Sequence, residues 1–116
     1  LIDGDLTMLA SGTVLQVGNA RIRLTFLCEP CAYLNQVRSG LAKHIGPRRG
    51  YLGRAVRDGS IHVGDAVMPI PDRFPAIPQD NACRFYDFVA RIPAGKVVRT
   101  TEVLLSLGMT QSYCRI

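Results

Sequence analysis

Two cysteines lie three residues apart in the stretch TFLCEPCAYLNQ, residues 25–36. Cys28 and Cys31 stand where a β-like run gives way to a helix-like run. The spacing has four interpretations: a dithiol redox centre, half of a metal site, one functional thiol, or two small buried side chains. Which one holds depends on the elements around the two sulfurs, because a thiolate forms only in a suitable electrostatic environment.

The surrounding elements favour one functional thiol and leave packing as the alternative. A dithiol centre normally belongs to a βαβ unit, whereas here a predicted β-hairpin precedes the pair and further short strands follow. A zinc site needs four ligands, and no second close pair is formed by Cys83, Cys114, His44 and His62. Free cysteine is often buried. Cys31, however, lies at the mouth of a predicted helix, where a thiolate is stabilised and can carry sulfur or bind a soft metal.

The composition fits one compact domain or a part-domain with an appendage, and it is rich in arginine. The chain has 116 residues, 47% of them hydrophobic, and a net charge of +5. Twelve of the 14 basic residues are arginines, whose guanidinium groups suit phosphate or carboxylate. The charge is spread along the chain, which argues against a dedicated nucleic-acid binder. With no long apolar run, no leader and four cysteines, we expect a soluble, cytoplasmic protein without a membrane partner.

Residues 1–70 are predicted to form a small curved sheet or barrel. Gly18-Asn19 separates two alternating runs and predicts a hairpin. Alternation places two sets of side chains on opposite faces: Ala20, Ile22, Leu24 and Phe26 on one, Arg21, Arg23 and Thr25 on the other. Residues 32–41 have helical spacing, with Gly40 near the end. In residues 50–70, the dipeptides at 58–59 and 64–65 divide three short strand-like runs.

The remainder is predicted to be a linker followed by helices. Residues 71–79 are rich in proline and are taken as the linker. Residues 80–116 predict a helix-turn-helix outline. Its first helix has an apolar stripe of Phe85, Phe88, Val89 and Ile92 and is capped by Asp80 or Asn81. A second helix runs from Thr100 or Thr101 to Gly108, and Thr110 caps a third that is cut short. We therefore expect the chain to be a piece of a longer protein.

Two longer stretches carry distinctive motifs. The first is GDLTMLASGTVLQVGNARIRLTFLCEPCAYLN, which contains a Pro-Cys pair, and the second is RRGYLGRAVRDGSIHVGDAV, which closes with a Gly-Asp turn. Together they resemble the C-terminal half of a MOSC domain, the module found at the C-terminus of molybdenum cofactor sulfurases. The likeness covers residues 3–68, and Cys31 corresponds to the family cysteine. The predicted fold class is therefore mostly β, part of a MOSC-type β-barrel whose other half lies upstream, with a small C-terminal winged-helix-like α-helical segment.

The MOSC resemblance also implies a function and a site. It implies molybdenum cofactor (pterin) binding or sulfur transfer, with Cys31 as the catalytic thiol and metal ligand. Arg48, Arg49 and Arg54 are the candidate cofactor-binding residues, although a solvated surface role is the alternative for each. A cysteine-desulfurase-type sulfur donor and a second copy that completes the barrel are the implied partners. Molybdenum ion binding, pyridoxal phosphate binding and catalytic activity are the associated family properties.

A second resemblance lies in FVARIPAGKVVRTTEVLLSLGMTQSYCRI. This stretch is similar to the winged-helix DNA-binding part of alkylguanine-DNA alkyltransferases and alkyltransferase-like proteins. The resemblance implies a DNA-binding module in which Gln111, Tyr113 and Arg115 contact DNA and the β part is a scaffold. The family's alkyl-acceptor motif is lacking, so Cys114 is not taken as an acceptor. A helical appendage that packs or mediates assembly is the alternative.

Overall fold

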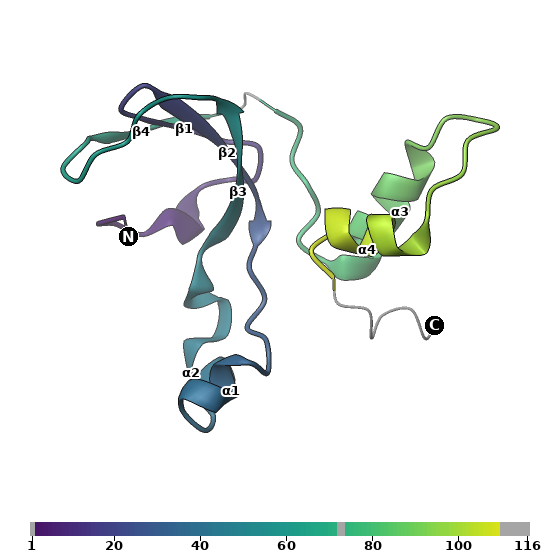
Figure 1. Cartoon of the computed structure of the whole chain (residues 1–116), viewed down its shortest axis with the longest axis horizontal. Helices are drawn as coiled ribbons and strands as arrows, with labels where there is room; N and C mark the ends of the chain where they lie inside the picture. Colours follow the sequence, from purple (N-terminus) through teal and green to yellow (C-terminus); the bar gives the residue numbers. More distant parts are fainter. Residues whose placement is uncertain (1, 72–73, 110–116) are drawn as a thin grey trace. The chain divides into compact units, whose positions relative to one another are not determined.

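The computed structural model describes residues 2–71 and 74–109, which form two compact units, Leu1–Ile77 and Pro78–Ile116. The first unit contains the strands and the second contains two helices (Figure 1). Each unit has its own small set of buried apolar side chains. The two are therefore described separately.

The first unit is built on a four-stranded antiparallel sheet with the order β3-β2-β1-β4. Its strands are β1 (Val14–Val17), β2 (Ala20–Leu27), β3 (Tyr51–Arg57) and β4 (Val67–Ile70). The predicted hairpin is confirmed: β1 and β2 pair with Val17 opposite Ala20. Gly18 has φ +52° in the turn between them, a conformation that glycine adopts without steric cost. The Gly-Asn pair therefore sets the register of the sheet.

One face of the sheet holds the core of this unit. Leu15, Val17 and Leu24 are buried together, and half-buried side chains from outside the hairpin pack on them: Leu6, Leu9, Tyr51 and Val67. Leu6 is the first residue of the short 3-10 helix η1 (Leu6–Met8), and Leu9 follows the helix. Asp5 caps η1 by accepting from the Thr7 backbone N–H at 2.8 Å. Tyr51 adds a hydrogen bond from its hydroxyl to the Leu9 carbonyl at 2.7 Å. Residues distant in sequence thus close the core.

The opposite face of the hairpin is covered in part by Phe74–Ile77, within the stretch predicted as a linker. The Arg23 guanidinium stacks on the Phe74 ring, 4.8 Å from its centroid, and donates to the Pro75 carbonyl at 2.9 Å. The Ile77 backbone N–H donates to the Ser11 hydroxyl at 2.8 Å. A Cβ at Gly12 would stand 2.2 Å from the Phe74 carbonyl oxygen. Only glycine therefore allows this close approach.

The sheet differs from the predicted barrel. Within the described residues the sheet is open, with β3 and β4 as its edges. The structure therefore contains an antiparallel sheet in place of the predicted barrel. Four strands are too few to close with side chains inside, since small barrels need about eight. That the sheet is part of a larger barrel stays a prediction.

The middle strand predicted between residues 50 and 70 is not formed. Residues 58–66 contain no strand and instead pass over the β1–β2 turn. The Asn19 N–H donates to the Ser60 carbonyl at 3.3 Å, and a Cβ at Gly59 would lie 2.4 Å from the Asn19 carbonyl carbon. The chain packs against the hairpin turn because residue 59 has no side chain. The predicted turn role of Asp65 agrees with its carboxylate accepting from the His62 N–H at 2.8 Å.

The helix predicted over residues 32–41 is two short helices. These are α1 (Leu34–Val37) and α2 (Leu41–Ile45), followed by the 3-10 helix η2 (Gly46–Arg49). The first helix ends at Arg38, whose backbone is extended, and Gly40 has a left-handed conformation with φ +74° just before the second helix. The Asn35 side chain accepts from the Ala42 N–H at 3.1 Å and links the two. Strands β2 and β3 lead directly to this helical connection (Figure 1).

The second unit consists of α3 (Asn81–Ala90) and α4 (Thr100–Ser106). The predicted cap is confirmed, because the Asp80 carboxylate accepts from the Cys83 N–H at 2.9 Å. The buried apolar residues lie on and just after α4: Val103, Leu104 and Leu107. The predicted stripe on α3 is wrong in part, since Phe85 and Val89 are exposed. The third helix predicted from Thr110 lies outside the described residues.

Arg84 is the buried side chain of α3, only 3% exposed. Its guanidinium donates to the carbonyls of Pro78 and Gln79 at 3.2 and 3.3 Å, and to the Asn81 side chain. These acceptors precede or begin the helix, so the guanidinium ties the entering segment to the first turns of α3. The sequence pattern did not predict this, because burial of arginine depends on acceptors that only the folded chain brings together.

Candidate functional site

The Pro-Cys segment begins where the β2–β3 ladder ends. Leu27 pairs with Tyr51 after an irregularity in the register, and the Cys28 N–H then donates to the Gly50 carbonyl at 2.8 Å. Gly50 has φ +89°, so the chain turns there from η2 into β3. The strand pair therefore holds residues 28–31 beside the end of η2.

Cys31 lies in the turn that enters α1. The Leu34 N–H donates to the Cys31 carbonyl at 3.1 Å. The Cys31 side chain is half-buried. Arg49, at the end of η2, donates from Nη1 to the Cys31 sulfur at 3.6 Å and to the Glu29 carbonyl at 2.8 Å. The carbonyl contact fixes the guanidinium beside the thiol. Two residues separated by 18 positions thus form one thiol-cation pair.

The environment favours the thiolate form of Cys31. Partial desolvation is the largest single influence and raises the pKa of the thiol. It is outweighed by the Tyr33 backbone N–H, the Arg49 guanidinium and the Leu34 backbone N–H, which together bring the pKa below its ordinary value. Each of these groups carries positive charge toward the sulfur. Cys31 is therefore a more acidic thiol than an unperturbed cysteine.

Cys28 has a different environment. Its thiol is free and half-buried, and it donates to the Glu29 carbonyl at a sulfur-oxygen distance of 3.9 Å. Cys31 is also free, so no disulfide joins the two. The thiols of this pair are therefore separate groups with separate neighbours.

Of the three candidate arginines, only Arg49 is brought to Cys31. Arg48 is exposed and donates to the His44 carbonyl at 3.1 Å, four residues earlier. Arg54 is exposed on β3, directly opposite Arg23 of β2. In the part of the chain that the structure describes, neither is hydrogen-bonded to Cys31. The cofactor-binding role predicted for all three stays a prediction.

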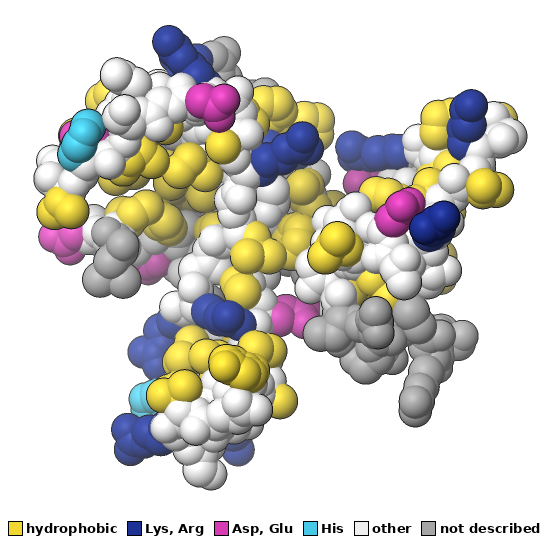
Figure 2. Space-filling view, viewed as in Figure 1, with side chains coloured by type: hydrophobic (Ala, Val, Ile, Leu, Met, Phe, Trp, Pro, Cys, Tyr) yellow, Lys and Arg dark blue, Asp and Glu magenta, His cyan; other side chains and the backbone are white. Residues whose placement is uncertain are grey.

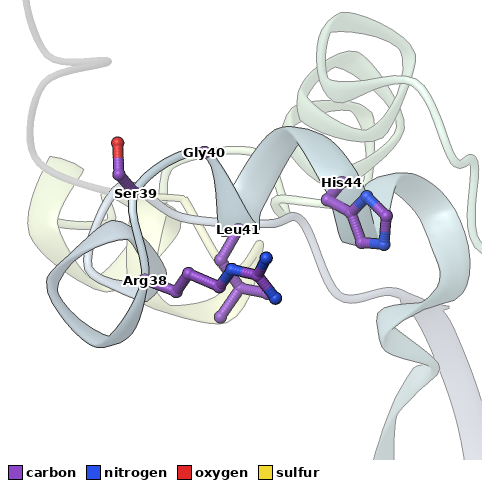
Figure 3. Close-up of a pocket in the computed structure, with 5 residues that line it drawn as sticks. All are labelled: Arg38, Ser39, Gly40, Leu41 and His44. Carbon is purple, nitrogen blue, oxygen red and sulfur yellow. The ribbon is translucent and has the colours of Figure 1, made fainter.

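Basic side chains gather around α1 and α2, as Figure 2 shows. A shallow depression of about 210 Å³ lies here, lined by Arg38, Ser39, Gly40, Leu41 and His44. In Figure 3 the Arg38 side chain extends beside Leu41, while the His44 imidazole points away from these two side chains. The sequence interpretation missed this depression because it took Gly40 as the end of one helix. The Ser-Gly pair was the available signal, since it marks a break between two helices.

The donor set around Cys31 suits a cofactor that brings most of its own metal ligands. Among the described residues, no group of three or more His, Cys, Asp and Glu side chains could hold a metal ion. The protein offers one thiolate, a soft ligand, with an adjacent guanidinium suited to an anionic group. This combination fits a single protein-metal bond with an anionic organic cofactor. It does not fit a metal ion held by protein ligands alone.

The residues predicted to contact DNA lie outside the described residues. These are Gln111, Tyr113 and Arg115. The helix-turn-helix outline is represented by α3 and α4, joined by residues 91–99. The winged-helix likeness is not confirmed, and the DNA contacts stay predictions.

The fold and the site define a small antiparallel β protein with an acidic thiol beside an arginine. The family model of the MOSC domain matches residues 1–68, and the chain belongs to this family. MOSC domains are associated with molybdenum cofactor binding and sulfurase-type function. The match gives no support to pyridoxal phosphate binding, DNA binding or a winged helix.

No curated protein and no solved structure gives a significant match to the chain. Across the described residues, none of the helices has both the length and the apolar character needed to cross a bilayer.

Proposed function

We propose that this chain contributes a thiolate ligand to a molybdenum cofactor site, with Cys31 as that ligand. The observation that supports the proposal most is the 3.6 Å contact between the Arg49 guanidinium and the Cys31 sulfur. Membership of the MOSC family supplies the cofactor class. A half-buried thiol with a lowered pKa supplies the ligand chemistry.

Each residue has a distinct proposed task. Cys31 offers its sulfur to the metal, and Arg49, together with the Tyr33 and Leu34 backbone N–H groups, favours the ionised form of that sulfur. Arg48 lies one residue from Arg49 on η2 and offers a second cation to an anionic cofactor group. When bound, a molybdenum cofactor supplies two-electron redox chemistry at the metal. The protein's part is to ionise and orient one sulfur.

A sulfur-carrier role is the second candidate, and the same lowered pKa favours it. A thiolate attacks the terminal sulfur of a persulfide on a donor protein of the cysteine-desulfurase type. A new sulfur-sulfur bond forms at Cys31, and the old one breaks to leave the donor's thiolate. Cys31 then carries a persulfide. This reaction needs only an ionised thiol that a donor can reach.

Assembly completes the proposal. Strands β3 and β4 are the edges of the described sheet, and an uncovered edge leaves backbone groups ready to pair. We propose that another part of the full-length protein, or a second copy, covers them. Light scattering on the full-length protein would separate the two, since only the second requires a dimer.

The test uses the full-length protein purified from cells that make the cofactor. Molybdenum is measured by mass spectrometry of the metal, and pterin by the fluorescence of its oxidised form. Cys31→Ser is expected to lose at least tenfold in molybdenum content, whereas Cys28→Ser, the matched control three residues away, keeps it. Arg49→Gln is expected to lose more than Arg49→Lys, which retains the charge.

Three results would decide against cofactor ligation by Cys31. One is wild-type protein with neither molybdenum nor pterin, and another is Cys31→Ser with full loading. The third is equal loss in Cys28→Ser. A mass gain of one sulfur atom on Cys31 after incubation with a persulfide donor, without bound molybdenum, would support the sulfur carrier instead.

A further inference from the structure

Four arginines form a square on the face of the sheet opposite the main core. Residues directly opposite each other in an antiparallel pair share a face. Arg23 pairs with Arg54 and Arg21 pairs with Arg57 across β2 and β3. The register shifts between these two pairs, so that an extra residue on β3 keeps Arg54 and Arg57 on one side. We refer to these four residues as the arginine square.

The neighbouring strands provide no counter-charge in the same rows. One row continues from Arg23 to Val14 and Ile70, and the other from Arg21 to Gln16 and Met68. The Arg21 Nε donates to the Gln16 side chain at 2.7 Å, a neutral partner. Among the described residues, no carboxylate forms an ion pair with any member of the square; the ion pairs present are elsewhere, at residues 62–65 and 87–91.

Two like-charged pairs side by side oppose folding of the sheet. Charges of one sign directly opposite each other destabilise a strand pair. Burial adds to the cost, because Arg21 and Arg23 are half-buried and the Arg23 Nε has no hydrogen-bond partner. Arg54 and Arg57 remain exposed. This arrangement is costly for the isolated sheet and favourable once an anion neutralises it.

We propose that the arginine square binds the phosphate backbone of double-stranded DNA without sequence preference. All four cations are guanidinium groups, which bind phosphate through paired N–H donors. The Arg23 guanidinium is already stacked on Phe74 and donates to the Pro75 carbonyl, so the phosphate contacts are assigned to Arg21, Arg54 and Arg57. Arg21 and Arg23 are two residues apart on β2 and therefore about 7 Å apart along the strand, and the strand pairing places Arg57 and Arg54 opposite them. The square is independent of the Cys31 site, since none of its members is hydrogen-bonded to that thiol. It also lies in the first unit and includes none of the residues predicted to contact DNA.

The polar character of this face favours DNA over a protein partner. A protein interface usually has an aromatic or aliphatic centre surrounded by polar groups. Here the centre is charged. The aromatic ring next to it, that of Phe74, has Arg23 stacked on it. The same lack of free aromatic rings on β2 and β3 disfavours single strands, whose bases stack on aromatic side chains.

The experiment measures binding of the full-length protein to a fluorescent duplex of mixed sequence over a range of salt concentrations. Three phosphate contacts give a slope of log K against log salt of about −2.7, from about 0.9 per contact. Arg54→Gln with Arg57→Gln is expected to weaken binding at least tenfold near physiological salt and to reduce the slope by about 1.8. Arg54→Lys with Arg57→Lys keeps the slope.

Two further variants separate binding from folding and from total charge. Arg38→Gln with Lys43→Gln removes the same two charges from exposed positions around α2 and is expected to keep the wild-type slope. Arg57→Glu converts a repulsive pair into an attractive one, so it is expected to raise the melting temperature while it weakens duplex binding at least as much as the double glutamine variant does. Loss of binding in a more stable protein cannot result from unfolding.

Several results would overturn the proposal. Equal weakening in the Arg38/Lys43 variant would mean that only net charge matters. An unchanged slope in the Arg54/Arg57 variant would remove the square from the interface. Tighter binding to a single strand of the same length, or to a poly-glutamate peptide, would assign the square to a different partner. None of these outcomes bears on whether Cys31→Ser loses molybdenum, so the two proposals fail separately.

Discussion

The sheet unit and the helical unit are stabilised by different interactions. In the sheet unit, strands far apart in sequence bring Leu15, Val17 and Leu24 into one apolar cluster. In the helical unit, three apolar residues near α4 are buried, and a buried arginine binds backbone carbonyls at the start of α3. The family match therefore falls on the unit with the interstrand core, while the second unit depends more on local polar contacts.

The two units also give opposite environments to a thiol. In the sheet unit, cationic and N–H groups lower the pKa of Cys31. In the helical unit, hydrogen bonding to the Asp80 carboxylate and its negative charge raise the pKa of Cys83. A cysteine thiol is therefore made more acidic in the sheet unit and less acidic in the helical unit.

The largest expected effect is on the core of the sheet. Leu15 is 2% exposed, and Leu15→Ala is expected to lower the free energy of unfolding by about 2–5 kcal/mol, because it removes buried methyl groups and leaves a cavity. Leu52→Ala is the matched control on β3, where the side chain is 39% exposed. It is expected to cost less than about 1 kcal/mol. Urea titration followed by circular dichroism measures both, and equal costs would contradict this description of the core.

The next effect tests the helical unit. Leu104 is 5% exposed, and Leu104→Ala is expected to cost about 2–3 kcal/mol in that unit, at the lower end for a buried leucine because few apolar side chains surround it. Leu105, the next residue on α4, is 82% exposed and provides the control. Hydrogen exchange should accelerate in α3 and α4 for Leu104→Ala. Faster exchange in Leu105→Ala would reverse the assignment of the buried face.

A smaller effect concerns the cap of α3. The strongest influence on the pKa of Asp80 is the hydrogen bond from the Cys83 backbone N–H, which lowers it. Hydrogen bonds from the Cys83 side chain and the Ala82 backbone lower it further. A carboxyl with a lowered pKa in the folded state stabilises that state above the ordinary pKa of aspartate. This stabilisation is lost as the pH falls from near 4 (about 3.9 in model peptides) through the folded-state value.

Two variants test the cap. Asp80→Ala is expected to lower the melting temperature at pH 7, whereas Asp80→Asn still caps the helix. Asp80→Asn should also lack the decrease in stability below pH 4 that the cap produces. Thermal unfolding between pH 2.5 and 7 measures this. A wild-type profile identical to that of Asp80→Asn would mean that the carboxylate contributes nothing.

The smallest effect in energy compares the two thiols directly. At pH 7.5, Cys31 is expected to react with iodoacetamide severalfold faster than Cys83, because more of it is thiolate. Mass spectrometry of the alkylated peptides gives both rates in one sample. Arg49→Gln should lower the alkylation rate of Cys31 only, and Asp80→Asn should raise the alkylation rate of Cys83 only. If both thiols reacted at the same rate at every pH, the electrostatic contrast between the units would be wrong.

Local signals in the sequence predicted those elements that depend on neighbouring residues. Gly18-Asn19 predicted the hairpin turn, and Asp80 predicted the start of α3, because a positive φ and a side-chain cap are local requirements. The helix over 32–41 was wrong where Gly40 interrupts it, although the glycine itself was visible. The strand expected near residues 60–63 was wrong because those residues pack on the hairpin turn, a contact that alternation cannot reveal.

Local sequence patterns were enough to predict the β-hairpin, the capped helix and the cysteine that carries the family likeness. They did not reveal which cation reaches that cysteine, because Arg49 is brought to it by the β2–β3 ladder and not by its position in the chain. The tertiary structure likewise decided that Arg54 stands opposite Arg23, because strand register depends on a shift that no local pattern encodes. The physical reason is the same in both cases: turns and caps form between near neighbours, whereas electrostatic partners are selected by long-range pairing.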